Sequence, residues 1–402
     1  MLPRPCLSFT LPSVYDDTKL DCRVYHPPCL RSPSRSGAPW PGHAAVVAHP
    51  YAPLGGCFDD PIVDIAAGTL LQLGFLVATF NFRGAASSEG RTSWTSKPEQ
   101  ADYVSIVGFL AYYVHHLDPP PPPAAPPENG NQRPVMLFAG YSYGAMVAAR
   151  LPPLETILAY FATPATHTAE ADIRLRALHL AEARNALAAA GPASPRKALG
   201  VRVGGDEDGA TPPRRRSHDG HDFLREDRIR ESVRHLLARA KLVYRRSPHW
   251  AAARQPGRGV DACLEGVGDM AFRSAYLLVS PPVGVVTRLA TMSFAGLLPA
   301  AWMGRGVREG GGAALLAANP TLLVYGGLDG FITHRKMREW TGLLAGGEAS
   351  RFRVLEVAGA GHFWMEGDVI YQLRDAIGTF ATELISLGGT PGPSLQMSQD
   401  LQ

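Results

Sequence analysis

Short apolar runs alternate with amphipathic segments along most of the chain. Mostly apolar runs predict strands at residues 44–48, 75–82, 135–139, 276–280, 321–325 and 352–357. Residues 61–73, 103–114 and 368–384 have the apolar spacing of helices packed on one face. Two shorter runs, 8–10 and 20–25, predict an antiparallel hairpin at a sheet edge. The pattern therefore predicts an α/β fold with a doubly wound, mainly parallel sheet.

Polar residues mark where the predicted helices begin and end. Asp60 is suited to cap the first helix, with Pro61 at its first position, and Gly74 is suited to end it. Ser96 and Glu99 have the spacing of a capping box ahead of the next helix.

Residues 151–274 interrupt this alternation and predict a helical insert. Two amphipathic helices are expected there, at 171–190, with Ile173, Leu178 and Leu187 as the apolar positions, and at 226–244. Between them, 191–220 is rich in Gly, Pro, Asp and Arg and is expected to be disordered. We therefore expect core segments at 1–150 and 275–387, a cap insert between them and a flexible tail at 388–402.

Composition narrows the class of protein without identifying a partner. The 402 residues are 46% hydrophobic, which is enough for a large core, and the net charge of +3 is too small to indicate nucleic acid. The first residues lack the apolar core of a signal peptide, and no apolar run approaches the ~20 residues of a membrane span. Five scattered cysteines suit a reducing compartment. The chain is thus expected to be cytoplasmic, with no membrane span.

Cofactor and metal signals are weak. Neither a phosphate loop nor a dinucleotide motif follows a predicted strand. His218 and His221 lie in the polar loop, where nothing would orient metal ligands. Cys57 is read as an incidental thiol. We expect neither a metal nor a cofactor.

The pentapeptide 140–144, Gly-Tyr-Ser-Tyr-Gly, joins a predicted strand to a predicted helix. Strand, sharp turn and helix are the setting of a nucleophile elbow, in which a strained serine projects its hydroxyl above the sheet. The flanking glycines allow the strand and helix to pass closely. Ser142 is therefore the candidate nucleophile.

Two further polar residues each follow a predicted strand. Asp329 comes after the strand at 321–325, and His362 comes after the strand at 352–357. The order Ser142, Asp329, His362 is that of the α/β-hydrolase triad and differs from the chymotrypsin and subtilisin orders. His362 would act as the base for Ser142, and Asp329 would orient His362.

These motifs resemble those of small cytosolic α/β-hydrolases of bacteria and fungi, loosely called dienelactone-hydrolase-like or serine-aminopeptidase-like. Residues 49–56 resemble their oxyanion loop, and 80–84 with Ser88 and Gly90 resemble the turn after their fourth strand. The resemblance covers about 7–150 and 275–385. It implies a carboxylic-ester type of hydrolase and does not identify the substrate.

An oxyanion hole needs two backbone donors near the nucleophile. Tyr143, directly after Ser142, is expected to supply one N–H. Pro50 has no N–H, so Tyr51 is the choice for the second, although the register of this loop is open by one or two residues.

The leading hypothesis is an intracellular serine hydrolase acting on a small-molecule carboxylic ester. A thioesterase, a peptidase and an acyltransferase share the same chemistry and remain alternatives, as does a scaffold without catalysis. Five aromatic and Met residues could line an apolar pocket, although ordinary core packing explains any one of them better: Met292, Phe294, Trp302, Phe363 and Trp364. The natural substrate and the oligomeric state cannot be read from the sequence.

Overall fold

A computed structural model describes residues 1–31, 40–117, 133–189, 272–282 and 310–386. These residues belong to one compact unit made of Met1–Gly191 and Ala262–Gln402. Several predicted features lie outside the described residues: the helix at 226–244, the loop 191–220, the tail 388–402, and Met292, Phe294 and Trp302.

The centre of the fold is an eight-stranded sheet in the order β1-β2-β4-β3-β5-β6-β7-β8. Its strands are β1 (Leu7–Pro12), β2 (Lys19–Tyr25), β3 (Ala44–Ala48), β4 (Leu76–Phe80), β5 (Val135–Tyr141), β6 (Arg273–Val279), β7 (Thr321–Gly326) and β8 (Phe352–Val357). β1 and β2 pair antiparallel, β2 pairs antiparallel with β4, and β3 to β8 run parallel. The predicted hairpin and the predicted mainly parallel sheet are both confirmed.

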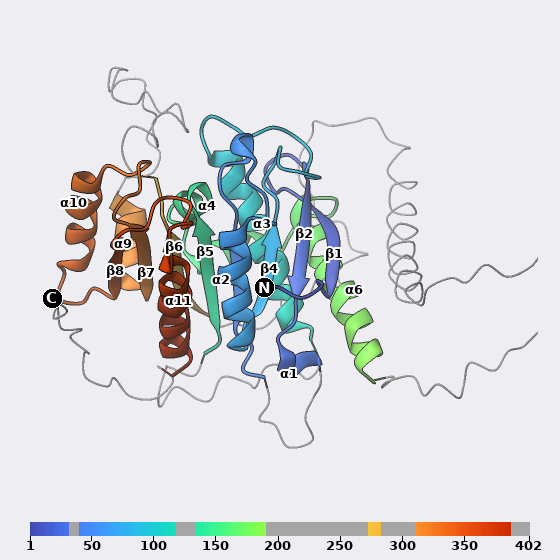
Figure 1. Cartoon of the computed structure of the whole chain (residues 1–402). Helices are drawn as coiled ribbons and strands as arrows, with labels where there is room; N and C mark the ends of the chain where they lie inside the picture. The colour runs from blue at the N-terminus through green and yellow to red at the C-terminus, as the bar shows by residue number, and fades with distance from the viewer. Residues whose placement is uncertain (32–39, 118–132, 190–271, 283–309, 387–402) are drawn as a thin grey trace, which may run out of the picture. The chain divides into compact units, whose positions relative to one another are not determined.

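Helices cover both faces of this sheet (Figure 1). They are α1 (Pro28–Arg31), the short η1 (Ala52–Leu54), α2 (Pro61–Gln72), α3 (Lys97–His115), α4 (Tyr143–Ala148), α5 (Leu154–Ala162), α6 (Ala169–Ala189), α9 (Gly310–Ala318), α10 (His334–Ala345) and α11 (Val369–Ser386). Helices α5, α9 and α10 were not predicted, because their short apolar stripes are interrupted by small or charged residues.

Successive side chains of a strand point to opposite faces of the sheet, and each set packs against the helices on its own face. In β5, Val135, Leu137 and Tyr141 join the core cluster that includes α2 and α11. Phe138 points to the other face, where its ring lies 6.3 Å from that of Tyr103 in α3. Strands buried on both faces read as continuous apolar runs, which is why the sequence pattern located them.

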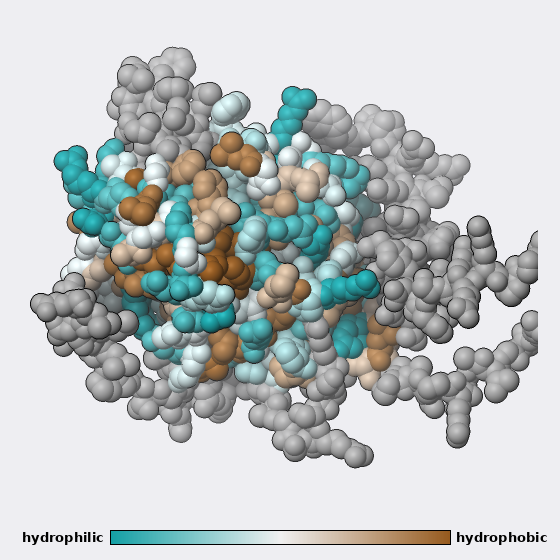
Figure 2. Space-filling model, viewed as in Figure 1, coloured by the Kyte–Doolittle hydropathy of each residue, from teal (hydrophilic) through white to brown (hydrophobic). Residues whose placement is uncertain are grey.

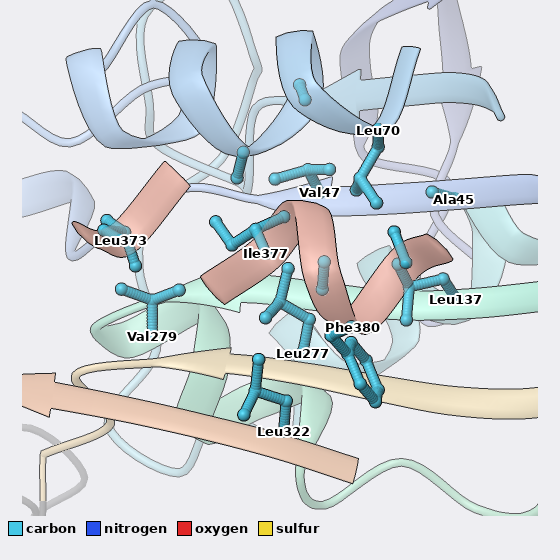
Figure 3. Close-up of a cluster of buried hydrophobic side chains, with 14 of the residues drawn as sticks. Ala45, Val47, Leu70, Leu137, Leu277, Val279, Leu322, Leu373, Ile377 and Phe380 are labelled. Carbon is cyan, nitrogen blue, oxygen red and sulfur yellow. The ribbon is translucent and has the colours of Figure 1, made fainter. Parts of the chain in front are cut away.

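The larger core cluster lies between α2, α11 and the sheet (Figure 3). Leu70 of α2 and Ile377 and Phe380 of α11 pack there over Val47 of β3 and Leu277 of β6. In the same view as Figure 1, hydrophobic residues also reach the surface around α2 and α11 (Figure 2). Leu73, Ile370, Ala376 and Ile385 are among the partly buried residues that pack on this cluster, so the surface patch continues the core.

The two predicted helix caps have different outcomes. Asp60 caps α2 as expected, because its Oδ1 accepts a hydrogen bond from the Ile62 amide at 2.8 Å. The capping box at Ser96 is wrong. Ser96 has φ 57° and makes no side-chain cap bond, while the Glu99 carboxylate accepts from the amide and hydroxyl of Ser93. The helix α3 begins at Lys97, earlier than the predicted 103.

The described part of the predicted insert packs on the core. α6 lies against α3 and β1, and α5 lies against α3, where Phe161 occupies the space beside Gly108. The predicted apolar stripe of α6 is only partly right: Ile173 is buried, whereas Leu187 is 44% exposed. The buried stripe is completed by small residues, among them Ala177, which a pattern of large apolar residues misses. The cap itself stays a prediction, since 190–271 lie outside the described residues.

Candidate active site

The turn between β5 and α4 holds Ser142 in a strained conformation, with φ 53° and ψ −115°. The Ser142 amide donates to the Val279 carbonyl at 2.8 Å, which fixes the turn to the next strand. A Cβ added to Gly140 would lie 2.3 Å from the Gly144 carbonyl carbon, and one added to Gly144 would lie 2.6 Å from the Ala48 oxygen. The turn therefore requires glycine at both positions, as a nucleophile elbow does.

Ser142, His362 and Asp329 meet at the carboxyl edge of the sheet. His362 Nε2 lies 2.9 Å from Ser142 Oγ, and His362 Nδ1 lies 2.8 Å from Asp329 Oδ2. Ser142 and His362 are 8% and 7% exposed, and Asp329 is fully buried. Asp329 Oδ1 also accepts from the Phe331 amide at 2.9 Å, which orients its carboxylate. The structure brings together the three residues that the sequence order predicted.

The loop that carries His362, residues 358–367, is held close to the loop that carries Asp329. The Leu328 amide donates to the Ala360 carbonyl at 2.9 Å, and a Cβ on Gly326 would lie 2.1 Å from that oxygen. The indole of Trp364 donates to Ser280 Oγ at 3.2 Å. Trp364 is therefore part of the core, in agreement with the core packing that the sequence favoured over a place in a substrate pocket.

Tyr141, the last residue of β5, also contacts the His362 loop. Its hydroxyl donates to the main-chain carbonyl of His362 at 2.8 Å, and it is 3% exposed. No sequence pattern predicted a role for Tyr141 beyond its place in the pentapeptide. The sequence shows that Tyr141 precedes Ser142. It does not show that the Tyr141 hydroxyl bonds to His362, which is 221 residues away.

The two residues predicted to supply oxyanion donors contact each other through their side chains. The rings of Tyr51 and Tyr143 pack with centroids 5.1 Å apart, which brings the loop after β3 beside the elbow. His49 holds the start of this loop. Its Nδ1 lies 2.6 Å from the Pro50 oxygen, and its Nε2 accepts from the Phe82 amide at 2.9 Å. Burial lowers the pKa of His49 to about 4, so the imidazole is neutral and can both donate and accept.

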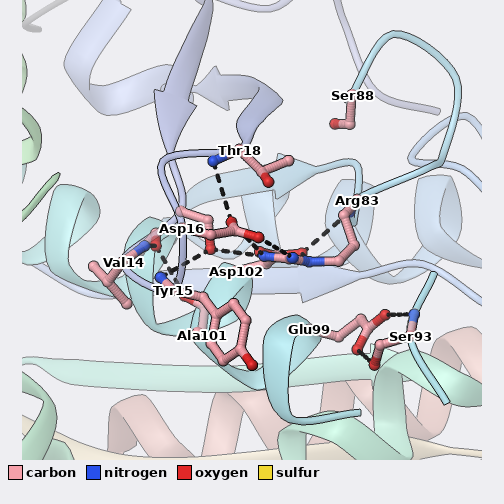
Figure 4. Close-up of polar contacts among 12 residues, drawn as sticks. Val14, Tyr15, Asp16, Thr18, Arg83, Ser88, Ser93, Glu99, Ala101 and Asp102 are labelled. Atoms are coloured by element: carbon pink, nitrogen blue, oxygen red, sulfur yellow. Dashed lines mark hydrogen bonds and ion pairs between the residues drawn. The ribbon is translucent and has the colours of Figure 1, made fainter. Parts of the chain in front are cut away.

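An ion-pair network that joins the buried Arg83 and Asp102 to the exposed Asp16 lies beneath the turn after β4 (Figure 4). Arg83 donates to Asp102 at 2.6 and 3.0 Å and to Asp16 at 2.9 Å. The hydroxyl of Ser88 donates to the Asn81 carbonyl at 2.7 Å and accepts from the Asp21 amide. These residues of the family-like turn hold β2, the end of β4 and α3 together, which is a structural contribution.

Aromatic rings surround the imidazole of His362. The ring of Phe331 lies 4.5 Å and that of Phe363 5.4 Å from the His362 ring, centroid to centroid. Phe363 is 60% exposed. Of the predicted pocket residues within the described chain, Phe363 is thus the one placed beside the site.

Within the described residues, no group of three or more His, Cys, Asp or Glu side chains could hold a metal ion. Cys57 is a partly exposed free thiol, and His218 and His221 lie outside the described residues. None of the described helices combines the length and apolar character needed to cross a membrane.

Over residues 16–199 the chain matches the X-Pro dipeptidyl-peptidase (S15) family. The match covers a little under half of the chain and includes Ser142, but it ends before Asp329 and His362. No curated protein matches the chain. Its strand order and its elbow give the chain the α/β-hydrolase fold, and this match is consistent with that superfamily. The fold and the matched family are those of serine hydrolases.

Several solved structures are similar to the chain at low sequence identity. An α/β serine hydrolase without a lid from Xanthomonas campestris is 16% identical, with 97% of this chain and 99% of that chain covered and a TM-score of 0.45. Est1E from Butyrivibrio proteoclasticus, with ferulic acid bound, is 12% identical, with 94% and 99% covered and a TM-score of 0.44. A serine hydrolase homologue from Coxiella burnetii is 13% identical, with the same coverage and a TM-score of 0.44.

Proposed function

We propose that the protein is a serine hydrolase that cleaves a carboxylic ester through an acyl-enzyme on Ser142. One observation carries the proposal: a strained serine has its Oγ 2.9 Å from an imidazole whose other nitrogen is 2.8 Å from a buried carboxylate. Each of the three residues follows the carboxyl end of a different strand. A purely structural role would not require all three side chains in this geometry.

In the proposed first step, Ser142 Oγ attacks the substrate carbonyl while His362 Nε2 accepts the hydroxyl proton. The imidazolium that forms is stabilised by Asp329, which accepts from Nδ1. When the tetrahedral intermediate collapses, His362 returns the proton to the departing alcohol and leaves the acyl group on Ser142. Water then attacks the acyl carbon and loses a proton to the same nitrogen. When this second intermediate collapses, the bond from the acyl carbon to Ser142 Oγ breaks, His362 returns the proton to Oγ, and the acid is released.

The carbonyl oxygen becomes negatively charged during both attacks. We propose that the backbone N–H groups of Tyr143 and Tyr51 stabilise it, as the packing of their rings supports. The neutral His49 supports this role because it ties the start of the Tyr51 loop to the end of β4. Loss of one such donor typically lowers turnover by about 10²–10³.

The S15 match favours a second candidate, a peptidase that releases an X-Pro dipeptide. Thioester hydrolysis and acyl transfer need the same acyl-enzyme and differ only in leaving group or acceptor. The exposed ring of Phe363 beside His362 favours an apolar group on the substrate at this position.

The discriminating experiment compares purified wild type with Ser142→Ala on three substrates. These are p-nitrophenyl esters of graded acyl length, matching acyl thioesters, and an X-Pro p-nitroanilide. We expect ester turnover that Ser142→Ala abolishes and little release of p-nitroaniline. Faster cleavage of the X-Pro amide would establish the peptidase instead. No turnover of any substrate by folded protein would favour the scaffold.

A further inference from the structure

Tyr141 connects the strand that leads to the nucleophile with the loop that carries the base. Its hydroxyl donates to the His362 carbonyl at 2.8 Å, and its ring centroid lies 5.6 Å from that of the His362 imidazole. One buried side chain of β5 therefore contacts both the backbone and the ring of His362.

The Tyr141 hydroxyl is held in its donating form. Burial is the main cause that raises the pKa of Tyr141, and the charges of Asp60 and Asp329 raise it further. Among the described residues, the Tyr141 phenol is the only hydrogen-bond donor to the His362 carbonyl. Without it, this carbonyl would be a buried acceptor that lacks a partner.

Two other side-chain hydrogen bonds of the described residues attach the His362 loop to itself and to the residue after β6. Glu366 accepts from the Gly361 amide, which closes the loop on itself, and Trp364 donates to Ser280 after β6. Neither bond is made directly to a residue of β5, whose end sets the position of Ser142. The Tyr141 bond is, because it begins one residue before the nucleophile.

We infer that Tyr141 is a positioning residue that sets the distance between His362 and Ser142 by holding the His362 backbone. This inference rests on the proposed function. It predicts that loss of the hydroxyl affects proton transfer, a step that requires a short Nε2 to Oγ distance, more than it affects substrate binding.

Tyr141→Phe removes one oxygen atom and keeps the ring. We expect kcat to fall by about 5- to 30-fold with KM changed less than about twofold, since one buried hydrogen bond is lost and the pocket is retained. Tyr112→Phe is the matched control. It also removes a buried phenol bonded to a backbone carbonyl, that of Phe161 at 3.0 Å, but between α3 and α5. It should lower the unfolding midpoint similarly and leave kcat unchanged.

A second measurement is independent of turnover. The Nδ1 proton shared by His362 and Asp329 should give a far-downfield proton NMR signal, identified by its loss in Asp329→Asn. We expect this signal to shift or broaden in Tyr141→Phe and to be unchanged in Tyr112→Phe. An unchanged kcat and signal, or equal effects of the two variants, would overturn the inference. If wild-type Ser142 proves unreactive, the proposed function fails, and the NMR comparison still decides the role of Tyr141.

Discussion

Ser142 and His362 are 220 residues apart in sequence, yet the Oγ of the serine lies 2.9 Å from Nε2 of the histidine. This closeness follows from topology, because parallel strands end at the same edge of a sheet and β5 and β8 both place their following loops there. The loop of Asp329 comes from β7, next to β8. Three local turns thus form one site only after the whole sheet has assembled.

Asp329→Asn is expected to lower kcat by about 10³–10⁴, since an amide can stabilise the wrong histidine tautomer at nearly the same volume. Asp368→Asn is the control, because Asp368 is an exposed carboxylate just before α11. We would measure kcat of both variants on a p-nitrophenyl ester and check their folding by circular dichroism. Near-normal turnover in folded Asp329→Asn would mean that another group orients His362.

Gly144→Ala should destabilise the elbow, because the new Cβ would lie 2.6 Å from two backbone oxygens, those of Ala48 and His49. We expect a loss of about 1–3 kcal/mol or more in unfolding free energy, together with loss of activity. Gly342→Ala is the matched control in α10, where a Cβ meets no atom within 4 Å. It should stabilise by about 0.5–1 kcal/mol. The free energy of unfolding of both variants is measured by urea unfolding. Equal changes in Gly144→Ala and Gly342→Ala would contradict the elbow geometry.

Two buried histidines should make the fold sensitive to mild acid. Burial lowers the pKa of both His43 and His49 to about 4, and the charge of Arg273 contributes to the shift of His43. The unfolded chain, with histidine pKa near 6.5, then binds more protons than the folded chain between about pH 6.5 and 4. Stability therefore falls as pH falls through this window, by up to about 3 kcal/mol for each histidine.

The variant His43→Asn tests this pH dependence. Asn keeps an acceptor for the Val135 amide, which donates to His43 Nδ1 at 3.0 Å, and it cannot take up a proton. Its stability should fall less steeply than that of wild type between pH 6.5 and 4. The exposed His179→Asn should follow wild type. Parallel curves for wild type and His43→Asn in urea unfolding at several pH values would show that His43 does not cause the loss.

Asp102→Asn should destabilise the protein by about 3–5 kcal/mol, because it leaves Arg83 buried with one of its two carboxylate partners removed. Glu89→Gln is the control, since the Lys19–Glu89 pair is exposed and should leave the unfolding midpoint unchanged. A small effect of Asp102→Asn would show that water or Asp16 compensates for the lost charge.

The features that the sequence predicted are those with local causes. Apolar runs located the parallel strands β3 to β8, and the glycines around Ser142 marked the elbow. Asp329 and His362 were found because each directly follows a strand. In these cases a short stretch of residues specifies its own conformation.

The features that the sequence missed depend on distant partners. Glu99 has capping-box spacing, but its carboxylate bonds to Ser93, because the preceding turn folds back over the start of α3. For Trp364 the sequence left a pocket position open beside core packing, and its indole bonds to Ser280, 84 residues away. The role inferred for Tyr141 likewise depends on a contact with the His362 carbonyl that no local pattern encodes.

The central claim is that Ser142 is an activated nucleophile, and labelling with a fluorophosphonate probe tests it most directly. The proposed chemistry predicts stoichiometric modification of Ser142, read by mass spectrometry of the labelled peptide, with loss of labelling in Ser142→Ala and strong slowing in His362→Ala. Modification of a different serine, or none in protein shown to be folded, would contradict the account.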